Sequence, residues 1–180
     1  MLNTMSETVI VAALKRGNLR RAVELILDTY QDEVYGYCAS LVGAAHSAPV
    51  YQQVLAVAME ELPTFNGRVS IRAWLYGIAR RVVLSYQSRA AADEVKVPIF
   101  PESRDDLPGL RPTDVELETC FAERLPREVR EILQLALWHG LLLSEVAHIT
   151  NRSPAAVRRL AAQGLSRLSG ELQRFSGTPS

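Results

Sequence analysis

The sequence predicts an all-α protein made of two small helical domains, the second of which contains a helix-turn-helix. Apolar residues recur at steps of three and four along most of the chain, and no strand-like alternation of useful length occurs. Prolines and acidic residues gather between residues 95 and 113, where no regular element is expected. We therefore predict a first domain over residues 1–94, a Pro-rich acidic linker over residues 95–113 and a second domain over residues 114–180.

Two helices are expected to open the first domain. A short helix runs from Ser6 to Arg16. The next is the clearest element of the sequence, because Asn18 is suited to cap its start and Gly43 to end it. Its apolar stripe consists of Val23, Ile26, Leu27, Tyr30, Val34, Tyr37 and Leu41.

Two more helices complete the first domain. The third is expected from about Ser47 to Leu62, with Pro49 tolerated in its first turn. After a loop, Ser70 is a suitable N-cap for a fourth helix that continues to about Ala92. The apolar stripe of this fourth helix consists of Ile71, Trp74, Leu75, Ile78, Val82 and Tyr86.

The second domain is expected to start near Asp114 and to be interrupted at Pro126. A helix then resumes and stops around His139 and Gly140, and a short helix follows from Ser144 to Ile149. The last predicted element is a longer helix. Its apolar stripe consists of Val157, Leu160, Gly164, Leu165, Leu168 and Leu172.

Residues 143–162 have the layout of a helix-turn-helix. Ala147 is small where two helices touch, and Asn151 stands in a tight turn at a position that suits the left-handed backbone region. Ser153 caps the longer helix, and Pro154 takes its first position. The residues expected to face DNA are Arg152, Ser153, Ala155, Arg158 and Arg159. The competing interpretation is an αα-hairpin that packs without touching DNA.

The predicted fourth helix and the loop before it form a cationic segment in a chain whose 20 basic and 20 acidic residues cancel. From residue 66 to residue 92 the charged residues are all arginines, namely Arg68, Arg72, Arg80, Arg81 and Arg89, and Trp74, Tyr76 and Tyr86 are interleaved with them. Arginines hold phosphates bidentately and aromatic rings stack on unpaired bases, a mixture that suits single-stranded nucleic acid. Taken alone, however, the pattern favours an ordinary amphipathic helix with aromatic core residues and solvated arginines.

A second unusual segment, residues 34–59, contains no Asp, Glu, Lys or Arg. It is either buried or an apolar surface covered by a partner, and burial is the favoured interpretation. Elsewhere the sequence argues against several function classes. The histidines lack metal-ligand spacing, no catalytic motif or cofactor fingerprint occurs, and no segment is long and apolar enough to cross a membrane. We expect no catalysis, metal or cofactor, and we expect Cys38 and Cys120 to be reduced thiols in the cytoplasm.

Four stretches, read together, resemble the extracytoplasmic-function group of bacterial sigma factors, the small two-domain members of the sigma-70 class. Residues 62–68 (LPTFNGR) and 70–81 (SIRAWLYGIARR) are similar to the family patterns LPxFxG and SxRxWLxxIARN. Residues 125–132 (LPREVREI) resemble the opening of the family's second domain, and residues 143–168 resemble its helix-turn-helix. The resemblance covers nearly the whole chain, from about residue 7 to residue 172.

This resemblance implies a transcription initiation factor whose partners are core RNA polymerase and promoter DNA, with an anti-sigma factor or another regulator as a further partner. It implies capture of a melted minus-ten element by Phe65, Asn66, Arg68, Arg72, Trp74, Arg80 and Arg81. The helix after Ser153 would enter the major groove at the minus-thirty-five element. By the same resemblance Gln52, Gln53 and Leu55 lie where family members bind core polymerase.

The sequence departs from the family at three places. Family members carry an acidic DAED-like run that docks on the polymerase clamp, but the aligned residues 46–53 are uncharged and keep only Gln52 of the pattern. Ser85 takes the place of an Asp on the melting helix, and residues 161–164 replace a basic run. We therefore expect weaker binding to core polymerase and to promoters.

Two other functions remain open. One is a protein-interaction module, a sigma mimic that binds a regulator through residues 34–59 and does not initiate transcription. The other, ranked last, is a free-standing helix-turn-helix repressor, which would leave the first domain unexplained.

Overall fold

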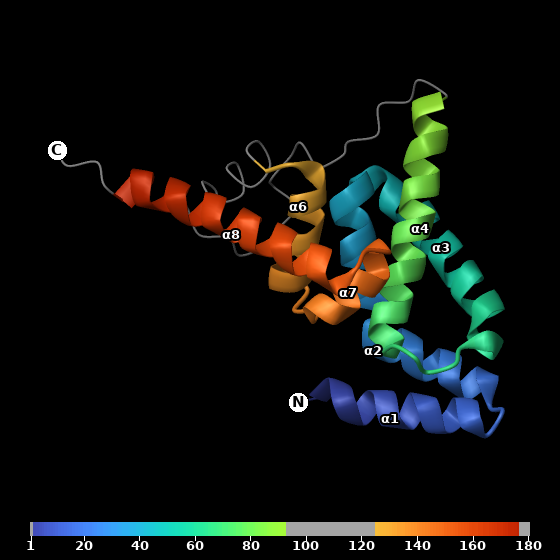
Figure 1. Ribbon diagram of the computed structural model, residues 1–180. Helices are drawn as coiled ribbons and strands as arrows, with labels where there is room; N and C mark the ends of the chain where they lie inside the picture. The colour runs from blue at the N-terminus through green and yellow to red at the C-terminus, as the bar shows by residue number, and fades with distance from the viewer. Residues whose placement is uncertain (1, 93–124, 177–180) are drawn as a thin grey trace. The chain divides into compact units, whose positions relative to one another are not determined.

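The computed structural model describes residues 2–92 and 125–176, and within these ranges the chain forms helices and turns with no strand (Figure 1). The all-α fold class predicted from the sequence is confirmed. The chain divides into two compact units, Met1–Glu102 and Ser103–Ser180. The predicted linker, the start of the second domain near Asp114, and Cys120 lie outside the described residues.

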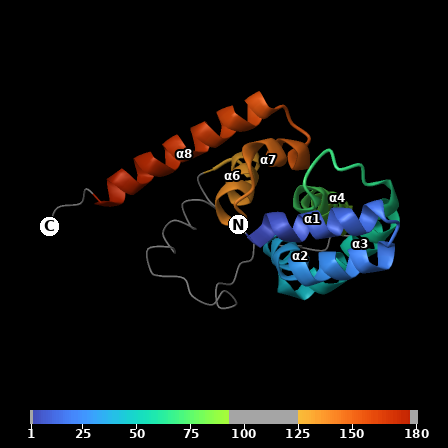
Figure 2. The same ribbon diagram turned by 90° about the horizontal axis from the view of Figure 1, so that it is seen from below.

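The first unit is a bundle of four helices. Its elements are α1 (Leu2–Lys15), α2 (Leu19–Val42), α3 (Ala44–Glu61), the 3₁₀ turn η1 (Leu62–Thr64) and α4 (Ile71–Ala92). Helix α1 lies alongside α2, and α4 packs against both α2 and α3 (Figures 1 and 2). This arrangement makes α2 the helix that packs against all three others, and it covers α4 from two sides, by α2 and by α3.

The predicted helix ends of this unit are confirmed by their hydrogen bonds. The Asn18 side chain accepts from the Arg21 N–H at 3.1 Å, and the Ser70 hydroxyl accepts from the Ala73 N–H at 3.0 Å. Gly43 ends α2, and its N–H donates to the Ala39 carbonyl at 2.9 Å. With φ at 76°, Gly43 lies in a region that side chains disfavour, which lets one residue end α2 and begin α3.

Two helix starts differ from the prediction. Helix α1 begins at Leu2 rather than at Ser6, because no proline or glycine interrupts the residues before Ser6. Helix α3 begins at Ala44 rather than at Ser47, so Pro49 lies inside the helix and not in its first turn. Ser47 is fully buried, and its hydroxyl donates to the Ala44 carbonyl at 2.8 Å while lying 2.8 Å from the Tyr35 hydroxyl. These contacts fix the extra turn.

The core of the first unit follows the predicted stripes and extends beyond them on α4. In α4, Ala73, Tyr76, Ala79 and Val83 are buried in addition to Ile71, Leu75, Ile78 and Val82. The second set of buried residues exists because α2 and α3 both pack on this helix. The charge-free segment 34–59 is buried only in part, because nine of its residues are buried and ten are exposed, with Tyr35 and Met59 among the exposed ones. The favoured burial interpretation therefore holds for one face of each helix and not for the whole segment. Within the described residues, no helix is long and apolar enough to span a bilayer.

The second unit contains the predicted helix-turn-helix. Its elements are α6 (Arg127–Leu133), the π-helical turn η2 (Gln134–Trp138), α7 (Leu143–Thr150) and α8 (Pro154–Ser176). Asn151 adopts the left-handed conformation, with φ 53° and ψ 46°, and the Ser153 hydroxyl accepts from the Ala156 N–H at 3.2 Å. The predicted stop near Gly140 is confirmed, because this residue has φ 60°. The π-helical turn before it was not expected.

The predicted apolar stripe of α8 is confirmed at Val157, Gly164 and Leu168, whereas Leu160 is half-buried and the Leu172 side chain lies outside the described residues. Leu165 is 47% exposed, and Ala161 is buried in its place. The buried residues Val157, Ala161, Gly164 and Leu168 follow one another at steps of four, three and four, whereas Leu165 lies about 100° around the helix from Gly164. Gly164 is where α8 approaches α6, and a Cβ there would lie 2.5 Å from Val129 Cγ1.

Candidate nucleic-acid interface

Local hydrogen bonds from backbone N–H groups hold the loop before α4 in its shape. The Asn66 side chain accepts from the Arg68 N–H at 3.1 Å, and Gly67 has φ 71°. The Phe65 N–H donates to the Leu62 carbonyl at 3.1 Å and continues the turn of η1. Of the predicted minus-ten residues in this loop, Asn66 and Arg68 are open to solvent, whereas Phe65 is half-buried.

Trp74 lies between the loop and an apolar pocket. Its ring centroid is 5.3 Å from that of Phe65, which is half-buried in the loop. The pocket is lined by Val23, Ile26, Leu27, Leu55, Ala58, Met59, Leu62, Trp74 and Leu75, which come from α2, α3, η1 and α4. Trp74 itself is half-buried, which suits a residue that supports the loop from the edge of the core.

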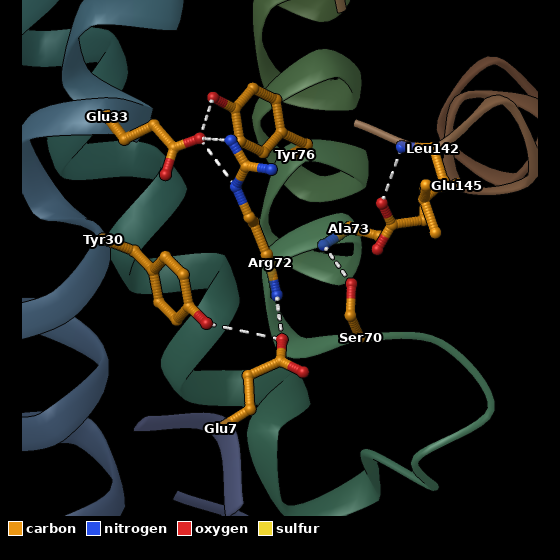
Figure 3. A network of polar contacts seen from close by, with 9 residues as sticks. All are labelled: Glu7, Tyr30, Glu33, Ser70, Arg72, Ala73, Tyr76, Leu142 and Glu145. Atoms are coloured by element: carbon orange, nitrogen blue, oxygen red, sulfur yellow. Dashed lines mark hydrogen bonds and ion pairs between the residues drawn. The ribbon is translucent and has the colours of Figure 1, made fainter. Parts of the chain in front are cut away.

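Arg72 points into the bundle and not toward the solvent. Its Nε donates to a Glu33 carboxylate oxygen at 2.7 Å, its NH2 group contacts the same oxygen, and its side chain is 17% exposed (Figure 3). The Tyr76 hydroxyl donates to that oxygen at 2.9 Å. The structure therefore gives Arg72 and Tyr76 intramolecular partners, although the sequence had placed both in the cationic aromatic surface.

The pKa of two tyrosines follows from this packing. Burial, and then the Glu33 carboxylate, raise the pKa of Tyr76. Burial, and then the Glu7 carboxylate, raise the pKa of Tyr30. Both hydroxyls stay protonated at neutral pH and remain donors to their carboxylates.

The other arginines of the segment differ in how they are held. Arg81 is exposed and pairs with Glu61 at 2.7 Å. Arg89 is exposed and donates to the Gln53 amide oxygen at 3.3 Å. Arg80 is half-buried and Arg68 is exposed. The accessible positive charge of the segment therefore lies mainly at Arg68, Arg81 and Arg89.

The residues predicted to bind polymerase lie on α3 but not on one surface. Gln52 and Gln53 are exposed, whereas Leu55 is half-buried and lines the pocket beside Trp74. At the start of the same helix His46 is tied to α4, with its Nδ1 atom 2.8 Å from the Tyr86 hydroxyl. The exposed part of α3 near Gln52 presents no charged side chain.

In the second unit the predicted DNA-facing residues gather at the start of α8. Ala155, Arg158 and Arg159 are exposed there, next to the cap at Ser153. Arg152 is partly committed within the unit, because it pairs with Glu128 of α6 at 3.0 Å. The left-handed turn at Asn151 directs the chain so that Arg158 and Arg159 stand on the solvent side of the hairpin.

Sequence reasoning missed the two glutamates that organise the N-terminus of α4. Glu7 of α1 accepts from the Arg72 backbone N–H at 3.2 Å, and Glu33 of α2 holds the Arg72 side chain. The residues of these pairs are 65 and 39 positions apart, so helical periodicity gave no signal for them. Within the described residues no group of three or more His, Cys, Asp or Glu side chains is placed to bind a metal ion.

Comparison with known proteins shows what this chain is similar to. Residues 26–92 match the family model for sigma-70 region 2. The chain is 26% identical over 167 residues to a probable RNA polymerase sigma-C factor of Mycobacterium bovis, a match that covers 87% of this chain and 85% of that protein. A tRNA (32-2'-O)-methyltransferase regulator, THADA of Gallus gallus, is 30% identical over 130 residues, which are 71% of this chain. The chain spans 6% of that protein's length.

Two solved structures share the fold. The structure of CnrH in complex with the cytosolic domain of CnrY has a TM-score of 0.65 at 20% identity and covers 94% of this chain and 98% of that chain. The sigma factor RpoE in complex with the anti-sigma factor NepR, from Bartonella quintana, has a TM-score of 0.65 at 18% identity and covers 83% of this chain and 96% of that chain. The sigma-70 region 2 match over residues 26–92 and the similarity to an RNA polymerase sigma factor over most of the chain support a diverged member of the sigma-70 family, and the two solved structures show the shared fold.

Proposed function

We propose that this protein is a transcription initiation factor that binds core RNA polymerase and directs it to promoters. The observation that carries the proposal is the acid-free run from Asn66 to Ala92, which lies on the sigma-70 region 2 match and leaves Arg68, Arg81 and Arg89 exposed. Positive charge beside an exposed loop suits the backbone of an unpaired DNA strand. No catalytic chemistry is part of this role, and we place it in the cytoplasm of a bacterium.

The second unit would supply recognition of duplex DNA. The start of α8 has the form of a recognition helix, with Arg158 and Arg159 free to reach phosphates or base edges in a major groove. Arg152, which is held by Glu128, would serve mainly to brace the hairpin. The first unit would then read the minus-ten element, and the second unit the minus-thirty-five element.

The first experiment asks whether the protein works with polymerase. Purified core enzyme is used in a pull-down, followed by run-off transcription from genomic fragments. We expect core binding and promoter-specific transcripts, with weaker core binding than that of a sigma factor that has the acidic cluster. A complete absence of core binding and of transcripts would contradict the proposal.

The second experiment separates the recognition helix from other positive charge. Arg158→Ala combined with Arg159→Ala is expected to abolish promoter-specific transcripts and to lower the salt slope of duplex binding by about 0.7 to 0.9 for each lost phosphate contact. Arg167→Ala is the matched control, because this arginine is exposed further along α8. Equal effects of the double variant and the control would argue against a recognition role for the start of α8.

One observation favours a second function. The exposed part of α3 from His46 to Gln53 carries no charge, so it lacks the side chains expected to meet a basic polymerase surface. RpoE and CnrH were solved with an anti-sigma factor and with the cytosolic domain of CnrY, respectively. A sigma mimic that binds a regulator in place of polymerase is therefore the second candidate. Transcripts that depend on Arg158 and Arg159 would exclude it.

A further inference from the structure

We propose that helix α1 completes the candidate nucleic-acid interface, and that Glu7 is a positioning residue for the loop 65–70 and the start of α4. This inference rests on the proposed function, since it concerns how the same surface is built. Helix α1 lies outside residues 26–92, the part of the chain that matches sigma-70 region 2. The family match therefore does not include α1.

The first step concerns the free N–H groups at the start of α4. The first turn of any helix leaves backbone N–H groups without partners inside the helix. Arg72 is the second residue of α4, and its N–H donates to Glu7 Oε1 at 3.2 Å (Figure 3). The next N–H, that of Ala73, donates to the Ser70 hydroxyl at 3.0 Å. Two caps thus hold one helix start, one local and one from a helix 65 positions away.

The second step concerns how Glu7 is itself held. The Tyr30 hydroxyl of α2 donates to the same Glu7 oxygen at 3.3 Å. The carboxylate therefore links α1, α2 and α4 at one point. A negative charge at this place is also favoured by the positive end of the α4 dipole.

The third step concerns the Arg72 side chain. Glu33 binds its guanidinium from α2, and Tyr76 lies below it, with the Arg72 Cζ atom 5.8 Å from the Tyr76 ring centroid. Arg72 is thus fixed through its backbone by Glu7 and through its side chain by Glu33. An arginine held in this way sets the position of α4 and leaves DNA contact to the exposed arginines.

The consequence lies in the loop, which enters α4 at Ser70. Asn66 and Arg68 are exposed in that loop and are the predicted contacts for an unpaired strand. Loss of the Glu7 cap frees the Arg72 N–H and loosens the first turn of α4, so the loop loses one of its two anchors. Binding to a melted strand should suffer, and binding of closed duplex by α8 should not.

The test compares Glu7→Ala with Glu7→Gln. The amide oxygen of Gln still accepts from Arg72 N–H and Tyr30 OH, so Glu7→Gln is expected to keep the position of the loop. Glu7→Ala is expected to weaken binding of a pre-melted promoter fork about tenfold and to leave duplex affinity unchanged. Glu24→Ala is the matched control, because Glu24 is an exposed glutamate that pairs with Arg20 on its own helix. All four proteins are compared with core polymerase supplied.

A second readout does not depend on DNA. Amide hydrogen exchange at Arg72 and Ala73 is expected to accelerate in Glu7→Ala, and to stay at the wild-type rate in Glu7→Gln and Glu24→Ala, with exchange in α3 as the reference for overall stability. Unchanged exchange in Glu7→Ala, or equal defects in the Ala and Gln variants, would overturn the proposal. If the wild-type protein binds no fork, the proposed function fails, and the exchange comparison still decides whether Glu7 positions α4.

Discussion

The rings of Phe65 and Trp74 pack against each other, with centroids 5.3 Å apart and planes inclined by 58°. The contact joins the loop before α4 to α4 itself. Trp74 also lines an apolar pocket, so one side of its ring faces the core and the other faces the loop. This geometry favours a packing role for Trp74 over direct stacking on a base.

Substitution of Trp74 tests that role. We expect Trp74→Ala to lower the free energy of unfolding of the first unit by about 3 kcal/mol, the lower end for a large core deletion, because the side chain is half-buried. Trp74→Phe keeps most of the contact and is expected to cost about 1 kcal/mol. Thermal unfolding and the fork-to-duplex affinity ratio are measured for both. A Trp74→Phe protein with normal stability but a reduced ratio would instead indicate base stacking.

The exposed ion pair between Arg81 and Glu61 leads to a prediction about DNA binding. Because surface ion pairs contribute about 0 to 1 kcal/mol, Glu61→Gln should change stability little. It should strengthen DNA binding, since it releases Arg81 for phosphate. Arg81→Ala should lower the salt slope of binding by about 0.7 to 0.9. Arg20→Ala, which removes an arginine from another exposed pair, serves as the control and should leave the slope unchanged.

The close approach of α8 to α6 makes Gly164 and Gly170 a matched pair. A methyl group at Gly164 would meet Val129 Cγ1 at 2.5 Å and Leu133 Cδ1 at 2.7 Å, whereas nothing lies within 4 Å at Gly170. Gly164→Ala is expected to destabilise the second unit by about 1 to 3 kcal/mol, and Gly170→Ala to stabilise it by about 0.5 to 1 kcal/mol. In a Trp74→Phe background, Trp138 is the one remaining tryptophan and reports urea unfolding of this unit. Equal effects of the two substitutions would contradict the packing described here.

Alkaline pH should destabilise the first unit. Burial raises the pKa of the Cys38 thiol from 9.0 to about 12, so above pH 9 the unfolded chain releases this proton more readily than the folded one. The contribution of this thiol to the free energy of unfolding is therefore fully present below pH 9. It is lost as the pH rises toward 12, by roughly 1 kcal/mol per pH unit. Tyr30 and Tyr76 act in the same direction. Cys38→Ala is expected to flatten the slope between pH 9 and 10.5, and an unchanged slope would exclude Cys38 as a source.

The helices and their caps could be predicted from the sequence because these signals are local. Ser70 and Asn18 lie next to the N–H groups that they satisfy, and Asn151 needs only its own turn. The start of α3 could not be predicted, because its extra turn depends on the buried contact of Ser47 with Tyr35, which belongs to another helix. The π-helical turn left no mark in the spacing of apolar residues.

The candidate site was predictable in part for the same reason. The exposed arginines Arg68, Arg158 and Arg159 stand where local pattern placed them, and their roles in DNA binding remain predictions. Arg72 was counted as surface charge because composition records a charge and not its partner. Its partner Glu33 is on another helix, and only the packed bundle brings the two together.

The shared acceptor at Glu33 constrains how this sequence is able to change over evolutionary time. Its carboxylate serves both Arg72 and Tyr76, and it is partly shielded from water. If Arg72 were replaced first, the Glu33 carboxylate would lose its cation. If Glu33 were replaced first, the Arg72 guanidinium would remain shielded without its carboxylate. In either order, the protein with a single replacement would be less stable. Among relatives of this protein, positions 33 and 72 are therefore expected to vary as a pair.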